Sequence, residues 1–327
     1  MNDAAATALP TFAARTATLR RLGWTERQAE WLALVCLHSG VFTRRQYADC
    51  YGVCRQRADQ VTVALIGAGI AREARFPDRR AYRPTGVCHI HARPLYRTLG
   101  IENNRHRKPA SPEITMRRLL SLDYVLEHQD LPWLPTEREK LAYFQGLGIS
   151  ATVLPRRVYR GSRTDRSTHR YFPLKLPIAG DGTTTTFVYT DTADRRPPRS
   201  AGIRSWAAAH AALWETLRNR GGAVHVVAVT RTDDRAAANA AILEKWCGPR
   251  APAVAHSAAD QQLLDDVELA NSTGDFSRLD KHGGWLEAGR RALRIEQRIK
   301  DARGPAKCID AYSTHVAERL APDVLAL

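Results

Sequence analysis

Four polar side chains within six residues have the chemistry needed to read nucleic-acid bases. Arg55, Gln56, Arg57 and Gln60 fall in the stretch CRQRADQVTVALIGAG. A guanidinium pairs bidentately with guanine and a carboxamide with adenine, so Arg55 and Gln56 are the first candidates for contacts to base edges. Contacts of this kind need a helix whose N-terminal turn enters the major groove.

Six further arginines are candidates for contacts to phosphates or to the minor groove. Two of them open a predicted helix, and four surround the turn at Pro77-Asp78. Guanidinium groups bound to phosphates gain affinity by releasing counterions. The six are Arg44, Arg45, Arg75, Arg79, Arg80 and Arg83.

The charge of the chain is uneven along its 327 residues, which carry a formal net charge of +15. Residues 1–110 hold 18 Lys and Arg against 8 Asp and Glu, and residues 151–200 hold 10 against 4. Residues 111–150 hold 4 against 6, and residues 201–327 hold 17 against 16. Two basic zones therefore flank a neutral helical connector. The net positive charge favours a polyanion, nucleic acid, over an acidic protein as partner.

Helix signals surround the candidate base-reading residues. Thr25 with Gln28, and Thr43 with Gln46, each fit a capping box, and they predict helices that end at Ser39-Gly40 and at Tyr51. A third helix follows Gly52, with Ala58, Val61 and Leu65 on its buried stripe.

The runs IAREARF and AYRPTG, on either side of the Pro-Asp turn, predict a β-hairpin. Three helices followed by an arginine-rich hairpin indicate a winged helix-turn-helix.

The rest of the chain alternates between helix and strand patterns. Helices are predicted at PEITMRRLLSLDYVLEHQ and TEREKLAYFQGLGI. Strands are then predicted at RYFPLKLPI, TTTTFVYTDT and VHVVAVTRT. One predicted helix lies between the second and third of these strands, and another follows the third. This order predicts an α/β layer with some parallel pairing. The predicted domains are a flexible N-terminus at 1–19, the winged helix-turn-helix at 20–110, a helical connector at 111–149, the α/β domain at 150–256 and a helical tail at 257–327.

Two metal sites were weighed as alternatives. A zinc site from Cys50, Cys54, Cys88 and His91 lacks a tight Cys-x2-Cys knuckle, and the six cysteines are expected to be reduced core thiols. In a nicking enzyme, His89 and His91 would hold a metal-bound phosphate near Tyr96 or Tyr124.

A nuclease of the restriction-endonuclease type would instead use carboxylates such as Asp191 and Glu127 around a metal. No Asp or Glu lies two residues before any lysine, so the Glu-x-Lys pattern of such enzymes is missing. We therefore expect no catalytic residues, no metal and no cofactor.

The stretch FTRRQYADCYGVCRQRADQVTVALIGAGIARE, together with the later FVYTDT and VHVVAVTRT, resembles the replication-relaxation family of plasmids and integrative conjugative elements. The resemblance covers about two thirds of the chain. It implies a winged helix followed by a degenerate restriction-endonuclease-like domain, and a role in replication control or mobilisation. It transfers no catalytic residues.

The sequence therefore predicts a cytoplasmic, non-catalytic protein that binds double-stranded DNA as a regulator or accessory factor of a mobile element. Absence of a signal peptide and of a long apolar run predicts that no membrane is involved. Two alternatives stay open, namely a metal-dependent endonuclease and a protein-interaction adaptor. Whether the chain forms a homodimer is also open.

Overall fold

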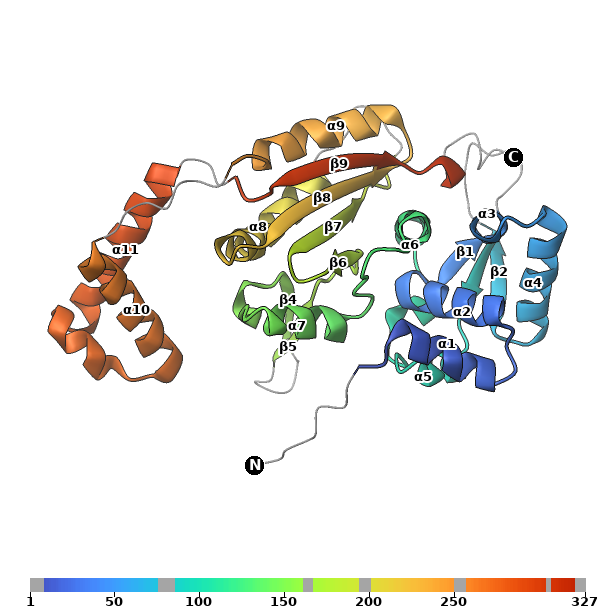
Figure 1. Ribbon diagram of the computed structural model, residues 1–327, viewed down its shortest axis with the longest axis horizontal. Coiled ribbons are helices and arrows are strands. Elements are labelled where there is room, and N and C mark those ends of the chain that lie inside the picture. Colours follow the sequence, from blue (N-terminus) through green and yellow to red (C-terminus); the bar gives the residue numbers. More distant parts are fainter. Residues whose placement is uncertain are drawn as a thin grey trace. The chain divides into compact units, whose positions relative to one another are not determined.

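The computed structural model describes residues 9–75, 86–160, 167–193, 201–249, 257–303 and 307–320 (Figure 1). The chain forms two compact units, Met1–Cys247 with Ile309–Leu327, and Gly248–Cys308. No helix in the described ranges has the length and apolar content to cross a membrane.

The first part of the larger unit combines helices with a small antiparallel sheet. Its helices are α1 (Phe12–Arg21), α2 (Glu26–His38), α3 (Arg44–Tyr51) and α4 (Arg55–Gly67). Its strands are β1 (Val41–Thr43), β2 (Ala71–Arg75) and β3 (Gly86–Ile90), paired in the order β1-β3-β2. The second strand of the predicted hairpin thus begins at Gly86, and residues 81–85 of AYRPTG lie outside the described residues.

Local signals fix the helix boundaries in this part. Both predicted capping boxes are formed, at Thr25 and at Thr43, and each satisfies backbone N–H groups that a helix start leaves unpaired. Helix α3 ends at Gly52, whose φ of 59° is a left-handed conformation that glycine adopts without strain. The predicted stripe of α4 is confirmed, because Ala58, Val61 and Leu65 are buried.

Trp31 of α2 lies at the centre of the core of this part. Its ring makes edge contacts with Phe42 and Tyr47, at centroid distances of 5.2 and 5.1 Å. All three side chains are almost fully buried. Phe42 lies in β1 and Tyr47 in α3, so the indole of Trp31 in α2 contacts side chains of two other elements.

A helical segment joins this part to a larger sheet. It comprises α5 (Arg93–Thr98), the 3-10 helix η1 (Arg105–Arg107), α6 (Pro112–Glu127), α7 (Glu137–Gly146) and the 3-10 helix η2 (Ala151–Val153). Helix α6 has two apolar faces. Leu122, Val125 and Leu126 join the core around Trp31, whereas Met116, Leu119 and Leu120 pack with strand residues of the larger sheet. The region predicted as a domain at 20–110 and residues 150–247 of the region predicted as another domain therefore share one compact unit.

The larger sheet is mixed, with four strands in the order β6-β7-β8-β9. Its strands are β6 (Ile178–Gly180), β7 (Thr184–Thr190), β8 (Ala223–Thr230) and β9 (Ala311–Val316). The β6 strand runs antiparallel to β7, whereas β7, β8 and β9 are parallel.

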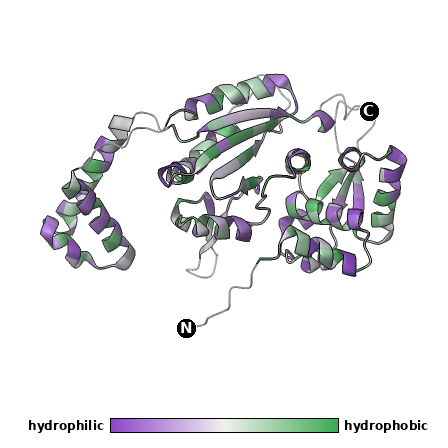
Figure 2. Cartoon of the chain, in the orientation of Figure 1, coloured by the Kyte–Doolittle hydropathy of each residue, from purple (hydrophilic) through white to green (hydrophobic). Residues whose placement is uncertain are grey.

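Helices α8 (Ala201–Asn219) and α9 (Asp233–Leu243) follow β7 and β8, and the 3-10 helix η3 (Glu244–Trp246) continues α9. Apolar residues concentrate along β8 in the middle of this sheet (Figure 2). The predicted α/β layer with parallel pairing is confirmed.

Two details of the predicted elements are wrong. The run RYFPLKLPI is not one strand, because β5 (Ser167–Tyr171) ends before Phe172, which has a positive φ of 47°, and β6 begins only at Ile178. The prolines in between cannot donate ladder hydrogen bonds. The tail at 257–327 is not helical throughout, since β9 pairs with β8 and is followed by the 3-10 helix η5 (Glu318–Leu320). A long-range parallel partner such as β8 cannot be read from local periodicity.

The smaller unit contains α10 (Ala258–Thr273), the 3-10 helix η4 (Phe276–His282) and α11 (Gly284–Arg303). Its core consists of small and aliphatic side chains: Leu263, Ala270, Leu279, Ala288 and Ile295. The helical character predicted for 257–303 is confirmed.

Candidate nucleic-acid interface

The first turn of α4 presents an exposed polar surface. Arg55, Gln56, Arg57 and Gln60 are all exposed. Among the described residues, no hydrogen bond or ion pair holds Arg55 or Gln56. Arg57 donates to the Gln60 carboxamide oxygen at 3.0 Å, which aligns these two side chains along the helix. The turn thus offers two unengaged side chains beside one prearranged pair.

Arg44 and Arg45 are both engaged in ion pairs. The Arg44 guanidinium lies 2.6 Å from Asp59 of α4 and contacts both carboxylate oxygens of Glu73 in β2. The Glu73 hydrogen bond holds the pKa of Arg44 above its usual value. Arg45 pairs with Asp49 at 3.3 Å, one helical turn away. Arg44 therefore fastens α4 to α3 and β2, and it neutralises the one carboxylate in the exposed turn.

The arginines predicted to lie on the β-hairpin are only partly placed. Arg75 ends β2, but its side chain is not among those described. Arg79, Arg80 and Arg83 lie outside the described residues. The hairpin brings the ends of β2 and β3 together in antiparallel register, with Arg75 opposite Gly86.

A second basic surface lies on an antiparallel hairpin formed by β4 (Arg156–Arg160) and β5. Tyr159 is 41% exposed and Val158 46% exposed, although both lie in a strand. The guanidiniums of Arg157 and Arg170 each lie 5.6 Å from the Tyr159 ring centroid. Two arginines from different strands thus share one exposed ring, an arrangement that sequence spacing alone did not reveal.

The residues of the nicking alternative are engaged elsewhere. His89 is 5% exposed, and its Nε2 lies 3.0 Å from the carbonyl oxygen of His106. Burial lowers its pKa to about 4, so it is neutral at physiological pH. The ring of His91 lies 6.3 Å from that of His89. Tyr96 is fully buried and its hydroxyl hydrogen bonds to the Ile90 carbonyl at 3.1 Å, out of reach of a phosphate on a duplex.

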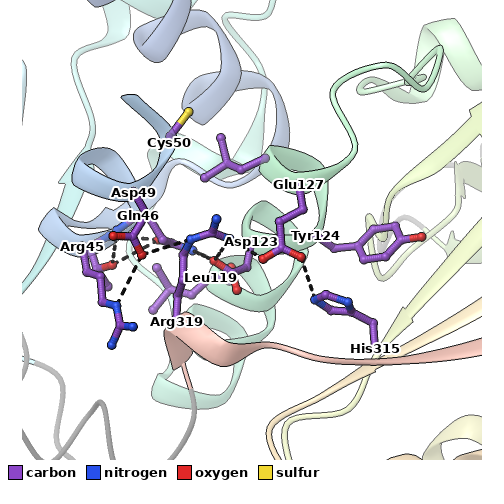
Figure 3. A network of polar contacts seen from close by, with 12 residues as sticks. Arg45, Gln46, Asp49, Cys50, Leu119, Asp123, Tyr124, Glu127, His315 and Arg319 are labelled. Atoms are coloured by element: carbon purple, nitrogen blue, oxygen red, sulfur yellow. Dashed lines mark hydrogen bonds and ion pairs between the residues drawn. The ribbon is translucent and has the colours of Figure 1, made fainter. Parts of the chain in front are cut away.

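Asp191 and Glu127 belong to separate ion-pair networks. Asp191 directly follows β7 and accepts hydrogen bonds from Arg235 and from Asn239, the latter at 3.0 Å. Glu127 pairs with Arg319 and lies 3.0 Å from His315 (Figure 3). Each carboxylate is thus already compensated by cationic or amide groups.

The four residues of the zinc alternative do not form a ligand set. Cys88 is buried, and burial raises its pKa to about 12, whereas Cys54 is exposed. In the described ranges none of the six cysteines forms a disulfide, and no group of three or more His, Cys, Asp or Glu side chains is arranged to hold a metal.

Comparison with known family models, curated proteins and solved structures gave no match to this chain.

Proposed function

We propose that the chain binds double-stranded DNA through a winged helix-turn-helix formed by α2, α3, α4 and the β1-β3-β2 sheet. The observation that carries the proposal is the first turn of α4, where Arg55 and Gln56 are exposed and unengaged. A recognition helix contacts base edges with its N-terminal residues, and these are the side-chain types that pair with guanine and adenine.

The contacts that hold α4 against α3, β2 and the core support this role. Base readout depends on side chains that are held in register, because misplaced hydrogen-bond donors lose their pairing geometry. Arg44 fastens α4 to both α3 and β2, and the buried stripe of α4 packs into the core around Trp31. The arginines at 75–83 then lie on the connection between β2 and β3, where a wing would contact phosphates or the minor groove.

The β4–β5 hairpin is the second element proposed to contact DNA. Its exposed Arg156 and Arg157, together with the half-buried Arg170, would add phosphate contacts, and each neutralised phosphate raises affinity at low salt. Tyr159 holds two of these guanidiniums by cation–π contacts, which reduces the side-chain entropy lost on binding.

The proposed biological role follows from the resemblance to the replication-relaxation family. We propose a regulator or accessory factor that acts at an operator or origin of a mobile element, in the cytoplasm. The α/β sheet would then serve as a scaffold, in keeping with Asp191 being compensated by Arg235 and Asn239.

Fluorescence anisotropy with labelled duplexes, measured from low to physiological salt, tests DNA binding. We expect the logarithm of the affinity to fall linearly with the logarithm of the salt concentration, with a slope of several units, because several phosphates are neutralised. The matched control is Arg290→Ala, which removes an exposed arginine of α11 and should leave the slope unchanged. Absence of binding at physiological salt would contradict the proposal and would favour the adaptor alternative.

A further inference from the structure

A cavity of about 440 Å³ lies within the larger unit, outside the proposed DNA-binding surfaces. It is lined by the start of α7, the segment from Gly100 to His106 and the turn from Tyr171 to Lys175. Cationic side chains dominate its lining. Arg15, Arg97, Arg138, Lys140 and Lys175 outnumber the carboxylates Glu102 and Glu137.

Lys140 is the most deeply buried of these cations. It is 3% exposed, and its ammonium donates to the Leu176 carbonyl at 2.6 Å and lies 5.6 Å from the ring centroid of Phe172. Among the described residues no carboxylate lies within ion-pair distance of it. A buried ammonium without a counter-charge is costly, so it is rarely kept unless something requires the charge.

Lys175 lies in the same cavity and also lacks a carboxylate partner among the described residues. Its ammonium donates to the Asn104 side-chain oxygen at 2.9 Å, a neutral acceptor. The two lysines repel each other, and this repulsion adds to desolvation, the larger cause of the lowered pKa of Lys140. A dianion between them would remove the repulsion.

The turn that carries Lys175 adopts an unusual backbone conformation. Phe172 and Lys175 have φ values of 47° and 55°, in the left-handed region that side chains other than glycine rarely adopt. Both residues line the cavity. Such conformations are strained and persist where the surrounding structure holds them, often around ligands.

The nearby carboxylates do not neutralise the lysines. Glu137 accepts a hydrogen bond from the Tyr171 backbone N–H at 2.9 Å. Glu139 pairs with Arg15 at 2.8 Å, and its other oxygen caps Thr136 at 2.8 Å. Glu102 is shared between Arg93 and Arg97. In the described part of the chain neither lysine therefore has a direct ion pair, and the carboxylates Glu137 and Glu139 act on Lys140 only at longer range.

We propose that this cavity binds a small phosphorylated molecule, with its phosphate groups between Lys140 and Lys175. The volume falls within the range of small-molecule sites, and the nearby Tyr171, Phe172 and Ile101 offer apolar surface to the rest of the ligand. A ligand must enter the cavity to reach Lys140, which suits a small molecule better than the continuous backbone of a duplex. The proposal does not rest on DNA binding.

Isothermal titration calorimetry of the full chain with inorganic pyrophosphate, at constant ionic strength, tests the proposal. Pyrophosphate is expected to bind with a one-to-one stoichiometry. Lys175→Gln keeps the size of the side chain and removes its charge, so it should weaken binding about tenfold, as expected for one lost charge-assisted contact. Lys140→Met should weaken binding at least as much.

Arg204→Gln is the matched control, because Arg204 is an exposed cation of α8 that does not line the cavity. Arg204→Gln should change the affinity for pyrophosphate less than about twofold, because solvent and salt screen an exposed charge outside the cavity from the bound ligand. Circular dichroism checks that each variant is folded. If Lys140→Met does not fold, the affinity of Lys175→Gln alone decides whether the cavity binds pyrophosphate. Undetectable binding of pyrophosphate, or equal affinities for Lys175→Gln and Arg204→Gln, would overturn the proposal. Binding of a short duplex in place of pyrophosphate, lost on Lys175→Gln, would also overturn it and assign the cavity to DNA.

Discussion

At the residue scale, the proposed DNA contacts differ between Arg55 and the hairpin arginines. Arg55 is placed to pair with a base, so Arg55→Ala should cost about 1–3 kcal/mol on the preferred sequence and little on random DNA. Arg79→Ala should instead weaken binding to all sequences alike and reduce the salt slope by about 1. Anisotropy titrations on both duplex types separate the two patterns. Equal losses for Arg55→Ala on both duplexes would assign Arg55 to the phosphates.

Lys140 gives the larger unit a pH-dependent stability. Burial lowers its pKa from 10.5 to about 7 in the folded chain, so between these values the unfolded chain binds more protons. The free energy of unfolding should therefore rise with pH, by about 1.4 kcal/mol per unit for this one group. The charged or titratable groups around it are Lys175, Glu137, Glu139, His38 and His210.

Urea unfolding of the wild type and of Lys140→Met at pH 7.0 and 8.5 measures this contribution. This window lies below the ordinary pKa of the buried thiols, whose raised pKa values act in the opposite direction. The wild type should gain stability over this window relative to Lys140→Met. Parallel pH dependences in the two proteins would show that Lys140 is not the cause.

At this scale the sequence revealed residue types but not their neighbours. The exposure of Arg55 and Gln56 followed from their place at the start of the predicted helix and is confirmed. The pairing of Arg44 with Asp59 and Glu73 was not foreseen, because Glu73 lies 29 residues away on another element. Lys140 could have been noticed, since it lies one turn before the buried Phe144 on the inner face of α7.

At the scale of elements, Trp31 should be the main support of the small sheet and its helices. Trp31→Ala would leave a large cavity between α2, α3 and β1, and we expect a loss of about 3–5 kcal/mol. Trp285→Ala is a suitable control, as this side chain is 59% exposed on α11, and it should cost less than about 1 kcal/mol. Thermal unfolding followed by circular dichroism measures both. Similar costs would contradict the central position of Trp31.

The β4–β5 hairpin can be tested as an element. The double variant Arg157→Ala/Arg170→Ala should reduce the salt slope of DNA binding by about 2, without changing sequence preference. The pair Arg290→Ala/Arg291→Ala removes the same charge from α11 and should leave the slope as it is. An unchanged slope in the first double variant would remove the hairpin from the proposed interface.

Most elements were predictable because their signals are local. Capping boxes and glycine stops placed α2 and α3, and the apolar runs placed β7 and β8. The break after Tyr171 was missed although Pro173 and Pro177 are a sequence signal against one continuous strand. The left-handed conformations of Phe172 and Lys175 depend on their surroundings and could not be predicted.

At the scale of the whole larger unit, Arg319 joins segments that are distant in the sequence. It forms ion pairs with Asp49 of α3 at 3.2 Å and with Asp123 of α6 at 3.4 Å, and it also pairs with Glu127 (Figure 3). Asp123 also accepts a hydrogen bond from Gln46 at 3.3 Å. The segment after β9 is thereby held against α3 and α6, which explains why it belongs to the same unit as the N-terminal helices.

Removing Arg319 should leave the fully buried Asp123 carboxylate uncompensated. We expect Arg319→Met to cost about 3 kcal/mol at neutral pH. Desolvation already raises the pKa of Asp123 to about 6, and loss of the cation would raise it further. The cost should shrink as the pH falls and the carboxyl is protonated. Adding Asp123→Asn should restore part of the stability, and an Arg319→Met cost that does not vary with pH would contradict this account.

The contacts between the segment after β9 and the helices α3 and α6 are the part of the fold that could not be predicted from the sequence. The parallel pairing of β9 with β8, and the contacts of Arg319, connect residues more than 80 positions apart. Local patterns carry no record of such partners, and so the tail was predicted as helical throughout.

Recovering the DNA that the purified full chain binds from a random duplex pool, and sequencing it, tests the central proposal most directly. The account predicts enrichment of a short motif that binds more tightly than random duplex at physiological salt, with the enrichment lost in Arg55→Ala and kept in Arg290→Ala. A bound pool with no enriched motif, or the same motif recovered by Arg55→Ala, would contradict sequence readout by the first turn of α4.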